Sequence, residues 1–516
     1  MTVRPSISKS VVRTVLAAAL AAGGLTVAHA PSALGAPAAP AAQTTAARAA
    51  VSAKAKVGAP KKVKIHNNYG KFKVTWKKPA GAIYFRMVVA SNKAMTKVLY
   101  KSKITKQTNA WTKSKKIVEG GKYWVTVQSF GKNKVAGKRS APKAVTTKIK
   151  APGHLDAVRT VALSPTALRV TWSGSAARAT GYRIDLSPTL GASPTYSQRV
   201  NGAKARGVDL TDLAAHGFAP GSQFYVTAVP TRYFNRDGGS RIVAAALPFV
   251  PPAGAPAFSA TVSSYNVRYS AATDAAGRGW AARVPLLAAR LAGSDIVGIQ
   301  EAGGKTPGSG VAGPDMARAT GLTRVNLPNG EPCSQDKAID ILLNANRFAV
   351  EECHMDQLPA GDNRWLLTVK ARERASDTPF LIATTHLIDG KEAAAASLRQ
   401  VQTNAVVELL ARYNQANMPV ILTGDLNSAE ASSTMASPTI LASAGYLGAD
   451  LVAPNLTNAE YTTSHGWTKA HEVAEHIDHI MANYKVVASS FGIHYGDPAA
   501  EPSDHFAISA SLSVYP

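Results

Sequence analysis

Residues that could do chemistry stand at the ends of short apolar runs in the second half of the chain. Residues 420–422 form one such run, typical of a buried strand, and a Thr-Gly pair ends it in a turn. Asp425 and Asn427 follow two positions apart, so in an extended chain both side chains point the same way from the end of the strand. Such a pair could hold a water molecule and a phosphate oxygen together.

Five more apolar runs end in polar side chains. In chain order these endings contain Asn266, Glu301, His386, Asp478, and the adjacent Asp504 and His505. The six endings, in this order and at these separations, resemble the endonuclease/exonuclease/phosphatase superfamily, which includes deoxyribonucleases, sphingomyelinases and inositol phosphatases. The resemblance extends over residues 256–516. It implies a four-layer α/β sandwich, and the alternation of strand and helix patterns in this region independently favours an α/β domain.

The resemblance implies a divalent-metal site. A phosphodiester repels nucleophiles, so its hydrolysis needs a metal ion, an activated water, donors for the transition-state charge and an acid for the leaving oxygen. By resemblance, Glu301 is the main metal carboxylate, Asn266 lies beside it and Asp504 is a candidate second ligand. Oxygen ligands without a zinc-type Cys/His cluster favour Mg²⁺, with Mn²⁺ or Ca²⁺ as alternatives.

The same resemblance implies the catalytic groups. Asp425 would orient and help deprotonate the attacking water, and Asn427 would bind phosphate. His505 would bind phosphate or act as acid and base, with Asp478 fixing its tautomer, because a carboxylate at one ring nitrogen decides which nitrogen carries the proton. His386 matches the leaving-group acid of the deoxyribonuclease-like members.

Other polar residues of this region fit the resemblance less closely. Arg364 matches an arginine that contacts phosphate in relatives. Residues 334–337 contain no Tyr where some nucleases of the family place one, so no partner for His386 is evident, and efficient cleavage of duplex DNA is in doubt. His476 and His479 have no counterpart with a known role, and we expect them in a solvated loop or behind the site.

Charge is divided unevenly along the chain. Residues 1–255 hold 40 Lys and Arg against 6 Asp and Glu, whereas residues 256–516 hold 18 against 26. Residues 57–150 alone hold 24 Lys and Arg against a single acidic residue, Glu119. A solvated basic surface would explain an excess of a few charges. For an excess of this size we expect capture of a polyanion: nucleic acid, an anionic cell-wall polymer or an anionic membrane face.

The basic region has the pattern of a β-sandwich. Residues 57–150 contain short alternating strands that resemble a fibronectin type III domain, with Trp76 on an early core strand and Tyr123 at the position of the family's corner tyrosine. Residues 151–250 repeat the pattern with Trp172, although Phe224 stands where the corner hydroxyl would be. A Pro/Gly/Ala linker over residues 248–256 separates them from the last domain.

The N-terminal residues and the cysteines indicate export. Residues 1–30 have the basic start, apolar run and small residues of a signal peptide, and residues 31–56 form an Ala/Pro-rich linker. Cys333 and Cys353 flank residues 338–350, which we expect to form a hairpin closed by a disulfide, two free thiols being the alternative. We therefore expect a secreted monomer, free or associated with the cell wall.

The leading hypothesis is a secreted, divalent-metal-dependent phosphodiester hydrolase, most simply a nuclease acting on DNA or RNA. One alternative is a phospholipase C or sphingomyelinase-like enzyme or an inositol phosphate phosphatase. A further alternative is a non-catalytic polyanion-binding surface protein, which the complete set of site residues disfavours. Among the supporting elements, residues 391–417 predict a long helix with an apolar face formed by Leu398, Val401, Ala405 and Leu409.

Overall fold

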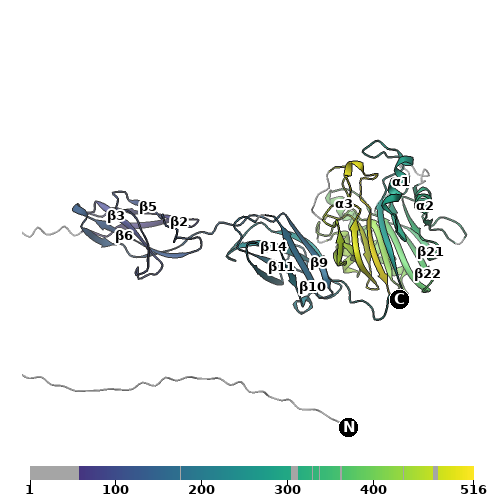
Figure 1. Cartoon of the computed structure of the whole chain (residues 1–516), viewed down its shortest axis with the longest axis horizontal. Coiled ribbons are helices and arrows are strands. Elements are labelled where there is room, and N and C mark those ends of the chain that lie inside the picture. The colour runs from purple at the N-terminus through teal and green to yellow at the C-terminus, as the bar shows by residue number, and fades with distance from the viewer. Residues whose placement is uncertain are drawn as a thin grey trace, which may run out of the picture. The chain divides into compact units, whose positions relative to one another are not determined.

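The computed structural model describes residues 57–516 apart from residues 175, 304–311, 328, 336, 361–362, 434 and 469–474. The predicted signal peptide and the linker over residues 31–56 therefore lie outside the described residues. Figure 1 shows three β-rich parts in this range, two built from strands with only short 3₁₀ helices and one that also carries the long helices. No helix among the described residues is both long and apolar enough to cross a membrane.

The first part consists of two antiparallel sheets. The three-stranded sheet has the order β1 (Lys61–Asn68), β2 (Lys71–Lys77), β5 (Asn109–Trp111). The other sheet contains β4 (Val98–Lys101), β3 (Tyr84–Ala90), β6 (Lys122–Phe130), β7 (Ala136–Arg139) and β8 (Lys143–Thr146), with the short helix η1 (Lys132–Lys134) before β7. Strand β2 alternates charged and buried side chains, so Phe72, Val74 and Trp76 enter the core while Lys71 and Lys77 face solvent.

The second part repeats this arrangement. One sheet has the order β13 (Gly207–Leu210), β10 (Ala167–Ser173), β9 (Ala157–Ser164). The other contains β12 (Tyr196–Asn201), β11 (Gly181–Ser187), β14 (Gln223–Arg232), β15 (Arg236–Asp237) and β16 (Arg241–Ala246), and η2 (Leu213–His216) follows β13. Trp172 on β10 and Phe224 on β14 are both buried in the core between the sheets.

The last part contains two larger mixed sheets. The seven-stranded sheet has the order β19 (Thr323–Arg324), β20 (Ile339–Leu343), β18 (Ile296–Gln300), β17 (Phe258–Asn266), β29 (Ile508–Val514), β28 (Val486–Ile493), β26 (Asn455–Thr457). The six-stranded sheet has the order β21 (Phe348–Gln357), β22 (Trp365–Glu373), β23 (Thr378–His386), β24 (Val420–Asp425), β27 (Asp478–Ala482), β25 (Leu447–Gly448).

Helices cover the outer faces of both sheets, which makes four layers, as predicted (Figure 1). Helices α1 (Trp280–Arg290) and α2 (Ala312–Thr320) pack on the seven-stranded sheet. Helices α3 (Ala393–Tyr413) and α4 (Ser437–Ser443) pack on the six-stranded sheet, and α5 (Ala449–Val452) and η3 (Pro498–Ala500) lie in connections. The largest apolar core, with Phe258, Phe348 and Phe380, fills the space between the two sheets.

The buried face of α3 differs from the predicted one. Val401, expected on the apolar face, is 46% exposed, while Arg399 and Gln402 are buried. Polar groups occupy this face because they hold the loop after β23: Arg399 donates to the carbonyl oxygens of Ile388 and Gly390, and the Gln402 Oε1 accepts the amide of Ile388. Apolar periodicity alone could not reveal such a support.

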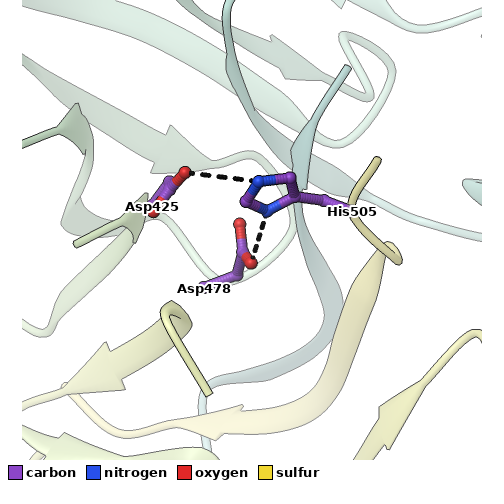
Figure 2. Close-up of side chains that lie close together, drawn as sticks. All are labelled: Asp425, Asp478 and His505. Carbon is purple, nitrogen blue, oxygen red and sulfur yellow. Dashed lines mark hydrogen bonds and ion pairs between the residues drawn. The ribbon is translucent and has the colours of Figure 1, made fainter. Parts of the chain in front are cut away.

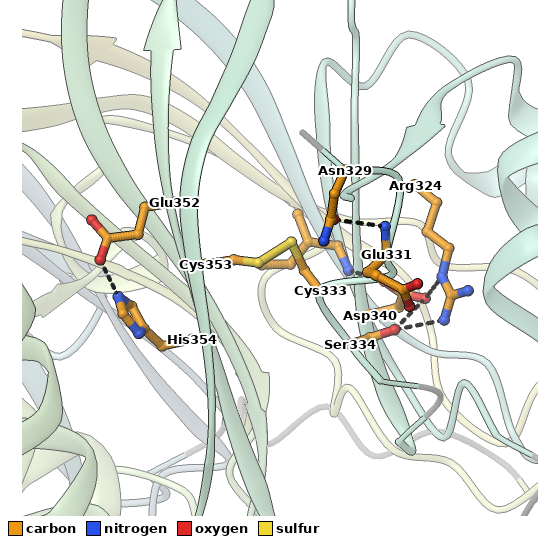
Figure 3. Close-up of a disulfide and its surroundings, with 10 residues drawn as sticks. Arg324, Asn329, Glu331, Cys333, Ser334, Asp340, Glu352, Cys353 and His354 are labelled. Carbon is orange, nitrogen blue, oxygen red and sulfur yellow. Dashed lines mark hydrogen bonds and ion pairs between the residues drawn. A yellow bond between two sulfur atoms is a disulfide. The ribbon is translucent and has the colours of Figure 1, made fainter. Parts of the chain in front are cut away.

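The predicted disulfide is present, but the predicted hairpin is wrong. Cys333 and Cys353 are bonded, as Figure 3 shows. Strands β20 and β21, however, pair in different sheets, since β20 lies beside β18 and β21 lies beside β22. The short turn at residues 344–347 is thus a passage from one sheet to the other, and the disulfide ties the two layers together.

Candidate active site

Three neighbouring strands of the six-stranded sheet deliver polar side chains to one edge. In the register of the sheet, His386 of β23 lies opposite Asp425 of β24, and Asp425 lies opposite Asp478 of β27. In the facing sheet, Asn266 ends β17 beside Gln300 of β18, and Glu301 follows directly. The polar residues at or just after the ends of β17, β18, β23 and β24 and at the start of β27 therefore come to the same edge.

Asn266 connects the two sheets at this edge. Its Nδ2 donates to Asp425 Oδ2 at 3.0 Å and to Glu301 Oε1 at 3.2 Å, while its Oδ1 accepts the amide of Arg268 at 3.1 Å. Glu301 has a backbone φ of 55°, and the amide of Tyr269 donates to its Oε2 at 3.2 Å. Burial raises the pKa of the Glu301 carboxyl. A carboxylate held in this way favours a nearby cation.

His505 lies between two carboxylates, as Figure 2 shows. Its Nδ1 is 2.8 Å from Asp478 Oδ2, and its Nε2 is 3.9 Å from Asp425 Oδ2. Burial alone would lower the pKa of His505, but the carboxylates of Asp478, Asp425 and Asp504 outweigh it and raise the pKa to about 10. The ring is therefore an imidazolium at neutral pH, with Nδ1–H fixed on Asp478 and Nε2–H directed into the site.

Hydrogen bonds between side-chain hydroxyls and the backbone position Asp478 and His505. The Thr463 hydroxyl oxygen accepts the amide of Asp478 at 3.2 Å, and the Ser503 hydroxyl donates to the carbonyl oxygen of Asn266 at 2.6 Å. The second bond attaches the segment that carries His505 to the end of β17. The histidine therefore keeps its place relative to Asn266, although the two residues are far apart in the sequence.

His386 has the opposite protonation. Burial lowers its pKa to about 4, so the ring is neutral at pH 7. Asn427 Nδ2 lies 3.2 Å from its Nε2 and donates to the carbonyl oxygen of Leu387 at 3.1 Å. Among the described residues its Nδ1 has no hydrogen-bond partner, as the missing Tyr led us to expect. A neutral His386 is a weaker leaving-group acid than His505.

The chain does not remain extended after β24. Asn427 has a φ of 48°, and its amide donates to Asp425 Oδ1 at 2.9 Å. The expectation of two parallel side chains on an extended strand is therefore wrong. The turn instead directs the Asn427 amide group toward His386, so both residues still border the same site.

Asp504 is held by a residue that the sequence did not suggest. Arg268 Nη1 lies 2.5 Å from Asp504 Oδ2, and the Arg268 guanidinium lies 5.3 Å from the centre of the Trp467 ring. A metal ion at Asp504 would have to share this carboxylate with Arg268 or displace it. Arg268 follows Asn266 by two residues, but no sequence pattern distinguishes it from a surface arginine.

Arg283 is a second residue that sequence reasoning missed. It is fully buried on α1. Its guanidinium donates to five carbonyl oxygens, those of Val267, Arg268, Tyr269, Ala272 and Pro502. It thereby fixes the segment that follows Asn266 and the segment that precedes Asp504 and His505.

Arg364 lies near the site but is paired. Its Nη2 is 3.2 Å from Asp389 Oδ1, and its positive charge contributes to the low pKa of His386. Its side chain is only 15% exposed, whereas that of Asp389 is 76% exposed. An anionic substrate could therefore compete with Asp389 for this guanidinium.

The donor set fits a divalent cation. Carboxylate oxygens of Asp425 and Asp478 lie within 4.8 Å of one another, and Glu301 is linked to Asp425 through Asn266. Asp478 Oδ1 is buried and has no hydrogen-bond partner among the described residues. Carboxylate and amide oxygens in this number suit a hard ion, and an unpaired buried carboxylate oxygen is costly without one.

A family model matches this part of the chain. Residues 263–505 match the model of the Endonuclease/Exonuclease/phosphatase family. A search of curated proteins gives no match.

Several solved structures are similar to the chain. A family member from Bacteroides thetaiotaomicron is 22% identical, with a TM-score of 0.40, covering 49% of this chain and 98% of its own. A mannosyl-6-phosphatase from the same organism is also 22% identical, with a TM-score of 0.40, covering 49% of this chain and 99% of its own. TDP2 of D. rerio, complexed with a single-stranded DNA product, is 18% identical, with a TM-score of 0.37 and coverages of 49% and 98%.

Proposed function

We propose that this protein is an exported nuclease. The premise is that residues 263–505 form an endonuclease/exonuclease/phosphatase domain, and therefore the domain of a hydrolase acting on phosphoester bonds. In this proposal it cleaves phosphodiester bonds of DNA or RNA and uses a divalent ion, for which Mg²⁺ is the first candidate. The observation that carries the proposal is the imidazolium of His505, held by Asp478 beside Asp425 at the edge where Asn266 and Glu301 also lie.

Each residue has a distinct part in this mechanism. Glu301, with Asn266 and the carboxylates around it, would hold the ion, which supplies Lewis-acid stabilisation of the phosphoryl oxygens and lowers the pKa of a bound water. Asp425 accepts hydrogen bonds on both oxygens, so it can orient the attacking water and accept its proton. Asn427 can donate to a phosphate oxygen.

In this structure His505 is the residue that can donate a proton. Its Nε2–H is directed into the site and can stabilise charge on a phosphate oxygen or protonate the leaving oxygen. His386, neutral and linked to Asn427, orients that amide group. This division differs from the role that the family resemblance suggested for His386, because burial keeps that ring unprotonated.

We also propose that the two β domains are of the fibronectin type III kind, over residues 57–150 and 151–250. Their three-stranded and five-stranded sheets and the buried Trp76 and Trp172 support this assignment. In the first domain, the Tyr123 hydroxyl accepts the amide of Val118 at 2.9 Å and donates to the carbonyl oxygen of Lys116 at 3.3 Å. These are the upstream backbone contacts that a tyrosine corner makes.

Export and anchoring complete the proposal. The disulfide between Cys333 and Cys353 supports an oxidising compartment, where such bonds persist. The Lys-rich domain would hold the acidic catalytic domain near nucleic acid or an anionic cell-wall polymer, because lysine contributes charge without sequence preference.

Hydrolysis assays with the full chain test the proposal. Plasmid DNA, RNA, sphingomyelin and inositol phosphates would be offered with Mg²⁺ and with chelator, alongside His505→Ala. We expect Mg²⁺-dependent cleavage of DNA or RNA that the substitution abolishes. Activity confined to sphingomyelin or inositol phosphates would keep the mechanism and overturn the substrate. Inactivity on all four substrates would contradict the enzyme proposal.

A further inference from the structure

A second group of ionisable side chains lies behind the candidate active site. Glu430 follows β24, Asp450 is on α5, and His479 is on β27 directly after Asp478. Successive side chains of a strand point to opposite faces, so His479 points away from the site that Asp478 enters. All three are buried, and their ligand atoms lie within 4.8 Å of one another. Of the two expectations for His476 and His479, the solvated loop is wrong, and the position behind the site is the one observed.

Hydrogen bonds determine which nitrogen of His479 carries its proton. Its Nε2 lies 3.0 Å from the carbonyl oxygen of Ser428. A carbonyl oxygen only accepts, so Nε2 carries the proton. Nδ1 has no hydrogen-bond partner among the described residues, so in the neutral ring it presents a lone pair.

That lone pair faces a carboxylate. His479 Nδ1 lies 3.3 Å from Glu430 Oε1, yet neither atom has a hydrogen-bond partner among the described residues. Two buried acceptors at this separation repel each other unless a proton or a metal ion lies between them.

His476 compensates only one of the two carboxylates. Its Nδ1 lies 2.8 Å from Asp450 Oδ2 and its Nε2 lies 3.0 Å from the carbonyl oxygen of Ala459. Both partners accept, so the ring carries two protons and a positive charge that pairs with Asp450. Hydrogen bonding of a ligating carboxylate by such a neighbour is common around protein-bound metals.

We propose that Glu430, Asp450 and His479 bind a divalent transition-metal ion that is separate from the ion of the catalytic site. One imidazole nitrogen and two carboxylates suit Zn²⁺ and its first-row neighbours better than Mg²⁺. Two ligand atoms bound to one zinc ion at about 2.0–2.2 Å lie about 3.4 Å apart at a tetrahedral angle. The 3.3 Å between His479 Nδ1 and Glu430 Oε1 agrees with this spacing.

A bound ion would have a structural purpose. Glu430 and Asp450 also border a cavity of about 430 Å³, whose lining includes His476 and Glu475. The three ligands come from the loop after β24, from α5 and from β27. A bound ion would therefore fix the strand that carries Asp478 and the loop that begins with Asp425 and Asn427.

Metal retention by the full chain tests the proposal. All variants would be made in a protein that carries Asp425→Asn. This substitution removes one carboxylate of the catalytic cluster, so the zinc that is retained reports on the second site. After treatment with chelator, incubation with ZnCl₂ and gel filtration, zinc is measured by mass spectrometry. We expect one zinc per chain in Asp425→Asn and at least a tenfold weaker affinity when Glu430→Gln is added. Glu475→Gln, which changes an exposed carboxylate lining the same cavity, should leave zinc binding unchanged.

Equal zinc retention with and without Glu430→Gln would overturn the proposal, as would failure of the Asp425→Asn protein to retain zinc. Thermal unfolding gives a second readout that separates metal loss from misfolding. Without metal, Glu430→Gln should melt at or above the wild-type temperature, because glutamine resembles a protonated glutamate and carries no charge. ZnCl₂ should raise the wild-type melting temperature and leave that of Glu430→Gln unchanged. A metal-free variant that melts below the wild type would contradict the argument from the two unpaired acceptors.

Discussion

His505 is the residue on which the proposed chemistry depends most. Its Nδ1 bond to Asp478 keeps the ring protonated and oriented, so removing that carboxylate should affect the transition state more than substrate binding. We expect Asp478→Asn to lower kcat for plasmid cleavage by about 10²–10⁴-fold, the usual range for a general acid–base group, with a smaller change in KM.

A matched substitution distinguishes this effect from a loss of acidic charge. Asp377, whose side chain is 84% exposed, pairs with Arg372 away from the site, so Asp377→Asn should retain wild-type cleavage. Comparable rates for Asp478→Asn and Asp377→Asn would rule out a role for the His505–Asp478 pair.

The His505–Asp478 pair should make the free energy of unfolding depend on pH in the alkaline range. The folded pKa of His505, about 10, lies above its unfolded value of about 6.5. A raised histidine pKa contributes stability that is complete below pH 6.5 and disappears as pH rises through 10. We expect the urea midpoint of the metal-free protein to fall between pH 7 and pH 10, and to fall less in Asp478→Asn. Parallel curves for the two proteins would contradict this linkage.

At the scale of elements, helix α1 stabilises the site through one side chain. Arg283 supplies donors to five buried carbonyl oxygens of the segments around Asn266 and His505. Each buried polar group left unsatisfied costs about 1–3 kcal/mol, so Arg283→Met should lower the free energy of unfolding by at least about 3 kcal/mol. Urea denaturation measures this, with the exposed Arg318→Met as control. A loss below about 1 kcal/mol would mean that water replaces the guanidinium.

The disulfide connects the two sheets and should stabilise them. Cys333 and Cys353 are 20 residues apart in the sequence, and a closed loop of that size is worth about 3 kcal/mol in the chain-entropy model. We expect Cys333→Ser combined with Cys353→Ser to lower the melting temperature while plasmid cleavage at 25 °C continues, because neither cysteine contacts the site residues. Unchanged melting would show that packing between the sheets suffices.

Sequence patterns predicted the strand ends well and the partners across the sheets poorly. Apolar runs located β17, β18, β23 and β24 because burial of a strand leaves a local signature, and each polar ending marked the place where the strand leaves the core. Contacts such as Asn266 with Asp425, or Arg283 with Pro502, join residues far apart in the chain, and no local pattern encodes them.

The two errors at this scale have the same physical origin. Alternating residues before and after a short turn indicate a hairpin, yet β20 pairs with β18 and β19 in one sheet and β21 pairs with β22 in the other, because alternation records burial and not the partner strand. Likewise, the buried face of α3 includes Arg399 and Gln402 because a loop needs donors and acceptors there. Periodicity measures hydrophobicity and cannot detect a polar side chain that is buried with its partners.

At the scale of the whole molecule, charge and catalysis occupy different parts of the chain. Residues 57–150 hold 24 Lys and Arg against one acidic residue, whereas residues 256–516 hold more acidic than basic residues. An acidic catalytic domain repels a polyanionic substrate on approach, so the basic domain should dominate the long-range attraction. Any binding it provides should therefore respond strongly to salt.

Duplex DNA binding by the full chain should weaken linearly on a plot of log affinity against log salt concentration, since each neutralised phosphate releases counterions. Lys64, Lys71 and Lys77 are exposed on β1 and β2, and replacing all three by glutamine should reduce the slope by about 3 if each contacts a phosphate. The control is a triple change of exposed basic residues in the last domain, at Arg318, Lys391 and Arg412, which should leave the slope unchanged. If the control reduced the slope as much as the change on β1 and β2, the nucleic acid would be bound by the catalytic domain, and the basic domain would be left with the cell-wall polymer as its partner.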